Sequence, residues 1–317
     1  MKNYAYKDLK GNKTYLNYNI HDILQIRSNI PVAPPCFIQE PSECVDIEVY
    51  RDGKLESPLS RLTPLGLRLF YDEDTLIHKC RFFLDAHLQI KDPQNKIILK
   101  FNRMYSLVRN PKAYFLAFLQ MKLLDKDFTF IHAAGVVKNG ESLLFPAFSD
   151  TGKTTTTLLF LKDGYNVLGD DKIITNGQTI FSYPQRIGKK TFRPFDTIPF
   201  LKKVKFRKFI NPPIVLKASP NKLFFLTIGN KNEVKEVDKE DITEKVSTMT
   251  EATCPLFPYP MGVMLGYYFI RNIPLNTYVE KRKRIMFQLL NKCETFMVTA
   301  KKSSEFYSLI KTKNENE

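Results

Sequence analysis

The chain has 317 residues, of which 43% are hydrophobic, so it can bury a large core and is expected to hold two domains or one domain with a substantial extension. Its formal net charge of +15 favours an acidic partner or substrate, because a positive field attracts anions. Five cysteines without a CxxC pair predict reduced thiols in a cytoplasmic protein, and we expect neither a secretory leader nor a membrane span.

Residues 1–125 form the first predicted region, which is rich in strands and loops and shows no visible chemistry. Residues 45–50 and 97–101 have the apolar or alternating pattern of strands. Pro111 can open a helix whose apolar side chains recur at helical spacing as far as Leu123, which predicts a buried helix. We predict that residues 126–317 form the catalytic domain.

The run FPAFSDTGKTTTT at residues 145–157 places Gly-Lys-Thr between a predicted strand and a predicted helix. A P-loop needs Gly, four residues, then Gly-Lys-Ser/Thr, so Ala147 stands at the position of the first glycine. Backbone N–H groups and a helix N-terminus favour phosphate, and an ordinary threonine-rich helix start is the alternative. The predicted site for ATP or ADP comprises Ala147, Phe148, Ser149, Asp150, Thr151, Gly152, Lys153, Thr154 and Thr155.

An acid pair follows the next predicted strand. Residues 158–161 supply an apolar helix face and residues 165–168 a buried strand, which completes a βαβ unit. A right-handed crossover would lay this strand parallel to the one before the loop and bring Asp170 and Asp171 to the phosphates. Asp170 with Thr154 would then hold Mg²⁺, and either acid could accept a proton from an attacking hydroxyl. Taken alone, such a pair is more often a turn or a helix cap.

Other candidates lie on either side of these motifs. His132, on an apolar run, could donate to a phosphate oxygen or to the acid pair, although a lone buried histidine is more often a core residue. Arg186 and Arg193 are candidates for a phosphate clamp or for recognition of a substrate carboxylate, with surface solvation as the alternative. Further along, we expect a hairpin at 172–183, a central strand at 222–228, a charged connection at 233–244 and a terminal helix at 277–293.

Three segments in order carry a family resemblance: FIHAAGVV at 130–137, the loop, and GYNVLGDD at 164–171. They resemble the catalytic core of HPr kinase/phosphorylase and its relatives, whose fold is similar to that of phosphoenolpyruvate carboxykinase. The resemblance covers roughly residues 130–187 and implies that His132 lies near the transferred phosphate. It also implies that Lys153 binds nucleotide and that the acid pair supplies a metal contact and the general base.

The chain also departs from HPr kinase itself. Ala147, Phe148 and Thr155 differ from the residues that this family commonly has, and the glycine-rich signature linked with phosphorolysis has no counterpart. These differences favour a kinase-only relative, such as the free serine kinases or the uncharacterised HPr-kinase-like proteins.

We therefore predict an α/β fold with a mixed central sheet around the P-loop, preceded by the β-rich region. The predicted activity is Mg²⁺-dependent transfer from ATP or ADP to a hydroxyl acceptor, either a serine-like metabolite or a seryl group of a protein. Two alternatives are a nucleotide-binding sensor or switch without kinase turnover and, less favoured, a basic nucleic-acid-binding protein. The sequence is compatible with a homo-oligomer. The predicted catalytic residues are Asp170, Asp171, His132 and Lys153.

Overall fold

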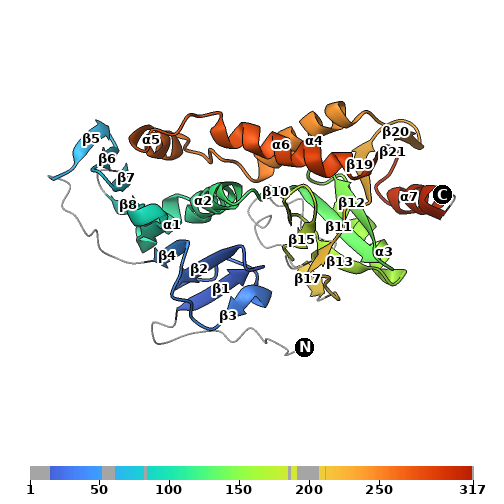
Figure 1. Cartoon of the computed structure of the whole chain (residues 1–317), viewed down its shortest axis with the longest axis horizontal. Coiled ribbons are helices and arrows are strands. Elements are labelled where there is room, and N and C mark those ends of the chain that lie inside the picture. The colour runs from blue at the N-terminus through green and yellow to red at the C-terminus, as the bar shows by residue number, and fades with distance from the viewer. Residues whose placement is uncertain are drawn as a thin grey trace, which may run out of the picture. The chain divides into compact units, whose positions relative to one another are not determined.

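The computed structural model describes residues 15–51, 61–81, 84–184, 187–190, 207–210 and 212–315 (Figure 1). The chain is mixed α/β, with several mixed sheets and a β-rich N-terminal region. Its contacts divide it into a first unit, residues 1–127 with 254–281, and a second unit, residues 128–253 with 282–317. The sequence suggested a single boundary near residue 125, between two continuous domains. By its contacts, the first unit also includes residues 254–281. Among the described residues, no helix has both the length and the apolar character to cross a bilayer.

A nine-stranded sheet forms most of the first unit, in the order β3-β1-β2-β4-β9-β8-β7-β6-β5. Strands β2, β4 and β9 run parallel to one another and the remaining pairs are antiparallel. The strands are β1 (Leu16–Ile20), β2 (Leu24–Ser28), β3 (Ile38–Gln39), β4 (Ile47–Arg51), β5 (Thr63–Gly66), β6 (Leu69–Tyr71), β7 (Thr75–Arg81), β8 (Leu84–Lys91) and β9 (Ile97–Phe101).

Helices α1 (Arg103–Val108), α2 (Pro111–Asp125) and α5 (Gly262–Ile270) complete the first unit, with 3-10 turns η1 (Pro35–Phe37) and η3 (Pro93–Asn95). Helix α2 begins at Pro111, as predicted, because Asn110 caps it by accepting a hydrogen bond from the backbone N–H of Lys112. Most of its side chains are buried, which confirms the predicted core helix. Helix α5 joins this unit because it packs on β6 and β7.

The second unit is built on a six-stranded sheet of order β13-β11-β12-β19-β21-β20. Because β12 and β13 are both antiparallel to β11, they run parallel to each other with β11 between them. A smaller sheet has the order β10-β14-β15-β18, and β16 pairs with β17. The strands are β10 (Thr129–Ile131), β11 (Ala133–Lys138), β12 (Glu141–Pro146), β13 (Asn166–Gly169), β14 (Ile173–Thr175), β15 (Ile180–Ser182), β16 (Ile187–Lys190), β17 (Arg207–Ile210), β18 (Lys217–Ala218), β19 (Lys222–Ile228), β20 (Glu233–Glu236) and β21 (Glu294–Ala300).

Helices cover both faces of the six-stranded sheet, because its central strands are apolar on both sides. On one face, Phe145 of β12 stacks on Phe160 of α3 (Lys153–Lys162), and α7 (Phe306–Glu315) packs there through Phe306. On the other face, Leu144 packs with apolar side chains of α4 (Lys239–Thr253) and α6 (Thr277–Asn291). The burial of these side chains holds the strand before the loop in the centre of the unit.

Two predicted elements need correction, while the strand at 222–228 and the hairpin around Asn176-Gly177 are confirmed as β19 and as β14 with β15. Residues 233–244 are not a connection, since they contain strand β20 and the start of α4. Their charged side chains suggested an exposed connection, but β20 is an edge strand, and edge strands tolerate charged side chains. The helix at 277–293 is not terminal, because β21 and α7 follow it.

Candidate functional site

The loop between β12 and α3 is shaped by Gly152. This residue has φ +130° at the helix start, and a Cβ placed on it would lie 2.6 Å from Cβ of Ser303, so only glycine fits. Ala147 is fully buried, and its φ is not positive. Alanine therefore fits the position of the first P-loop glycine without left-handed strain. The strained residue is Asp150, at φ +65°.

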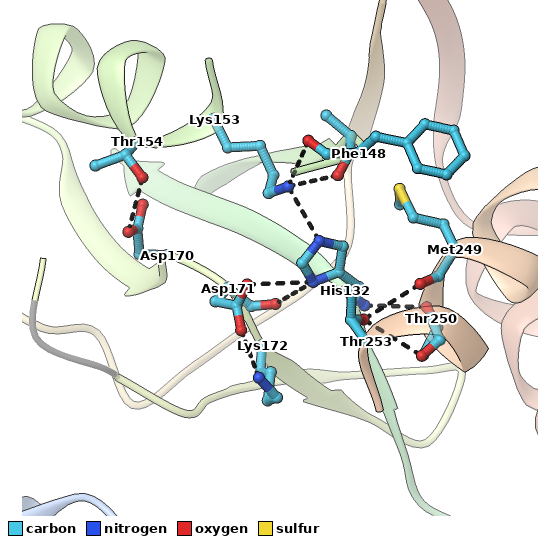
Figure 2. Close-up of polar contacts among 11 residues, drawn as sticks. His132, Phe148, Lys153, Thr154, Asp170, Asp171, Lys172, Met249, Thr250 and Thr253 are labelled. Atoms are coloured by element: carbon cyan, nitrogen blue, oxygen red, sulfur yellow. Dashed lines mark hydrogen bonds and ion pairs between the residues drawn. The ribbon is translucent and has the colours of Figure 1, made fainter. Parts of the chain in front are cut away.

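Lys153 turns back from the first turn of α3 and ties the loop to its surroundings (Figure 2). Its ammonium donates to the carbonyl oxygens of Ala147 and Phe148, the latter at 3.1 Å, and to Nε2 of His132 at 3.0 Å. Burial lowers the pKa of Lys153, and the nearby carboxylates, first that of Asp171, oppose this shift. All three N–H donors of the ammonium are therefore engaged.

His132 lies at the junction where the chain leaves β10 and enters β11, and it is 1% exposed. Its backbone N–H donates to Oγ1 of Thr250 at 3.1 Å, and Nδ1 lies 3.0 Å from the carbonyl oxygen and 3.3 Å from Oδ1 of Asp171. Because Lys153 donates to Nε2, these partners assign the proton of the neutral ring to Nδ1. Burial and then the charge of Lys153 lower the pKa of His132 to about 4.

The acid pair occupies the tight turn after β13. Gly169 starts this turn, and a Cβ there would collide with the carbonyl oxygen of Lys172. Asp170 accepts a hydrogen bond through Oδ2 from Oγ1 of Thr154 at 3.0 Å. Asp171 forms an ion pair with Lys172. Burial would raise the pKa of Asp171, but the attraction of Lys172, followed by His132 and Lys153, holds it below its ordinary value.

The structure thus brings together five of the predicted residues from three separate segments. The loop residues Phe148, Ser149, Asp150 and Thr155 are exposed, and Thr151 is half-buried. Arg186 and Arg193 lie outside the described residues. The five residues that come together are His132, Lys153, Thr154, Asp170 and Asp171.

Sequence reasoning missed three neighbours of the site. Lys172 was recognisable only as the residue directly after the acid pair. Thr250 of α4 contacts His132, and Ser303, in the turn before α7, packs against Gly152. In each pair the two residues are more than 90 positions apart in the sequence. No local pattern could reveal such contacts, because long-range packing creates them.

The donors available for a cation are oxygen atoms. Across the described ranges, no group of three or more His, Cys, Asp or Glu side chains could hold a metal ion. The hydroxyl of Thr154 and the carboxylate of Asp170 nevertheless fit Mg²⁺, which proteins often bind through one or two carboxylates while the substrate phosphates supply further ligands. These two residues could therefore complete a Mg²⁺ site only together with a phosphate-bearing ligand.

Comparison with known proteins gives no family for this chain. A scan against models of protein families found no match, and a search of curated proteins found none either. The function must therefore be argued from the geometry of the site.

Proposed function

We propose that the second unit is a Mg²⁺-dependent phosphotransferase that uses ATP or ADP and an acceptor with a hydroxyl group. One observation carries the proposal: the ammonium of Lys153 contacts His132, which in turn contacts Asp171, while Thr154 contacts Asp170. A helix start with a buried lysine, a carboxylate–hydroxyl pair and a second carboxylate are the parts that phosphoryl transfer needs.

In the proposed reaction, Lys153 neutralises the phosphates. Its three N–H donors are engaged in the ligand-free protein, so a phosphate oxygen must displace one of their acceptors. Nε2 of His132 is the one acceptor of the three that can change its role, because a ring that takes up a proton at Nε2 can donate to a phosphate oxygen, whereas a carbonyl oxygen can only accept. The exchange would leave Nδ1–H of His132 on Asp171 and keep that carboxylate oriented.

The two carboxylates of the acid pair have different roles in the proposed reaction. Asp170 and Thr154 would hold Mg²⁺, which when bound supplies charge neutralisation to the phosphates. Asp171 would accept the hydrogen bond of the acceptor hydroxyl and then its proton. Its lowered pKa makes it a weak base, which suits a loose transition state in which the hydroxyl is deprotonated late.

A sensor or switch without kinase turnover is the second candidate. It is favoured by the ion pair between Asp171 and Lys172, which reduces the basicity of the carboxylate, and by Phe148, whose exposed ring reshapes the loop surface. The products separate the two functions, because a kinase forms a phosphorylated acceptor and a switch releases only free phosphate or leaves the nucleotide intact.

The first experiment is calorimetric titration of the full chain with ATP and with ADP, with and without Mg²⁺. Lys153→Met should abolish nucleotide binding, since it removes a buried charge from the phosphates. Lys162→Met is the matched control, because it makes the same change at an exposed position near the other end of α3 and should bind like the parent. Failure of the parent to bind either nucleotide, or equal binding by Lys153→Met, would overturn the proposal.

Activity is tested next by incubating the parent with radiolabelled ATP and free serine or a seryl peptide. The double variant Asp170→Asn with Asp171→Asn should form no phosphorylated acceptor while still binding Mg²⁺-free nucleotide through Lys153. Turnover retained by this double variant would remove the acid pair from the mechanism.

A further inference from the structure

The turn that follows strand β21 lies at the same edge of the sheet as the loop between β12 and α3. Strands β12, β19 and β21 run parallel to one another, so their carboxyl ends share one edge of the six-stranded sheet. At this edge β12 leads into the loop, and β21 leads into residues 301–305, whose sequence is KKSSE. Open α/β sheets bind ligands at the carboxyl ends of their strands, so this KKSSE turn borders the proposed nucleotide site.

Ser303 brings the KKSSE turn into contact with the loop. A Cβ placed on Gly152 would lie 2.6 Å from Cβ, 3.4 Å from Cα and 3.5 Å from the carbonyl oxygen of Ser303. Because Gly152 directly precedes Lys153 at the start of α3, the backbone of the turn lies against the residue that opens this helix. A long side chain next to Ser303 can therefore reach a phosphate chain that the loop holds.

Two lysines of the turn combine a fixed backbone with exposed side chains. The N–H of Lys301 donates to Oδ1 of Asn232 at 2.9 Å, and the N–H of Lys302 donates to Oε2 of Glu305 at 3.1 Å. Both lysine side chains are exposed, and neither forms an ion pair with another residue of the described ranges. In the neighbouring turn after β19, by contrast, the ammonium of Lys231 lies 2.7 Å from the carboxylate of Glu233.

The loop itself offers little further positive charge to a phosphate chain. Its own lysine, Lys153, is 8% exposed, and its three N–H donors are engaged with the loop carbonyls and with His132. A nucleoside triphosphate carries several negative charges, and ammonium groups bind phosphate as mobile point charges. The KKSSE turn has two lysines against one acid, Glu305, so it supplies positive charge at the position where the loop is exposed.

We propose that Lys301 and Lys302 bind the phosphate chain of the nucleotide from the exposed side of the loop. The KKSSE turn is then a second wall of the nucleotide site, and the contact between Ser303 and Gly152 fixes its position relative to the start of α3. This inference rests on the proposed function and deepens it, because it adds two binding residues that belong neither to the loop nor to the acid pair.

Calorimetric titration of the full chain in Mg²⁺-free buffer tests the inference with ATP and with inorganic tripolyphosphate, which is a phosphate chain without base and ribose. The double variant Lys301→Ala with Lys302→Ala should weaken the binding of both ligands at least tenfold, because charge-assisted hydrogen bonds to phosphate are lost. The matching double variant Lys301→Arg with Lys302→Arg keeps the charge and the donors, so it should bind ATP within about threefold of the parent.

Lys162→Ala with Lys292→Ala is the control, because it removes the same number of charges from exposed positions of the same unit. Lys162 is the last residue of α3, and Lys292 lies just before β21, at the opposite end of that strand from the turn. Seven residues of strand span roughly 20 Å, well beyond the Debye length of about 8 Å at physiological salt. The control should therefore bind both ligands within twofold of the parent.

The outcomes separate this inference from the function on which it rests. If the parent binds ATP and the alanine variant binds it as the control does, the inference is overturned and the proposed function stands. Retained binding of tripolyphosphate by the alanine variant, no binding of tripolyphosphate by the parent, or equal losses for the arginine and alanine variants would also overturn the inference. A parent that binds no ATP would overturn the proposed function itself, and this inference with it.

Discussion

Replacing Gly152 by alanine should destabilise the second unit by about 1–5 kcal/mol, the sum of backbone strain and overpacking less the gain from a less flexible unfolded chain. The backbone at φ +130° would cost an L-residue about 1–3 kcal/mol. The new Cβ, 2.6 Å from Cβ of Ser303, would add an overpacking cost of about 1–3 kcal/mol. The smaller conformational freedom of alanine in the unfolded chain returns about 0.5–1 kcal/mol, so the net effect remains large.

Hydrogen exchange with mass spectrometry is the appropriate assay, because two units need not unfold together and peptides from α3 and β12 report on the second one. Gly140→Ala is the control: this glycine also has positive φ, +86°, but its Cβ would meet nothing within 4 Å. The control should lose only about 1 kcal/mol, since the strain is present without the collision.

The clash itself is isolated by a double variant. Ser303→Gly removes the Cβ that a methyl group at position 152 would meet, so combining it with Gly152→Ala should recover about 1–3 kcal/mol relative to the sum of the single changes. Gly152→Ala and Gly140→Ala could instead lose the same free energy of unfolding, with none recovered when Ser303→Gly is added to Gly152→Ala. That result would refute the close packing of the turn before α7 on the loop.

Three further predictions concern the polar contacts of the site. His132 should titrate near pH 4 in NMR spectra. Because the ring binds a proton below about pH 6.5 in the unfolded chain but only near pH 4 in the folded one, the free energy of unfolding should fall by about 3 kcal/mol as the pH drops from 6.5 to 4. The variant His132→Gln should show a smaller fall. An ordinary pKa for His132 would contradict its burial beside a cation. Lys172→Met should raise the pKa of Asp171 and move the acid limb of the pH–rate profile to higher pH, whereas an unmoved limb would exclude Asp171 as the base. Thr154→Val should weaken ATP binding in Mg²⁺ at least tenfold and leave Mg²⁺-free binding unchanged, and equal losses in both conditions would exclude a cation between Thr154 and Asp170.

The local framework of the site was predictable because its signals are local. An apolar run, a glycine-lysine-threonine and a second apolar run are enough to predict β12, α3 and β13. The parallel course of β12 and β13 was also predicted, from the strand–helix–strand pattern, and it is confirmed with β11 between the two strands. The convergence of His132, Lys153 and Asp171 was implied by a family resemblance, and the contacts between them support the same grouping.

The remainder depends on long-range packing. The sequence suggested that the loop could be bent at Ala147, where the P-loop pattern has its first glycine. Ala147 is instead buried without a positive φ, and the left-handed residue of the loop is Asp150. The return of residues 254–281 to the first unit arises because α5 packs on β6 and β7, and short-range periodicity carries no information about such pairings.

The most direct test of the account is the calorimetric comparison of ATP binding by the parent, Lys153→Met and Lys162→Met in the presence of Mg²⁺. The account predicts saturable binding by the parent and by Lys162→Met and none by Lys153→Met, because only Lys153 reaches the loop carbonyls and His132. Binding that survives in Lys153→Met, or a parent that binds no nucleotide, would contradict the assignment of this loop to phosphate.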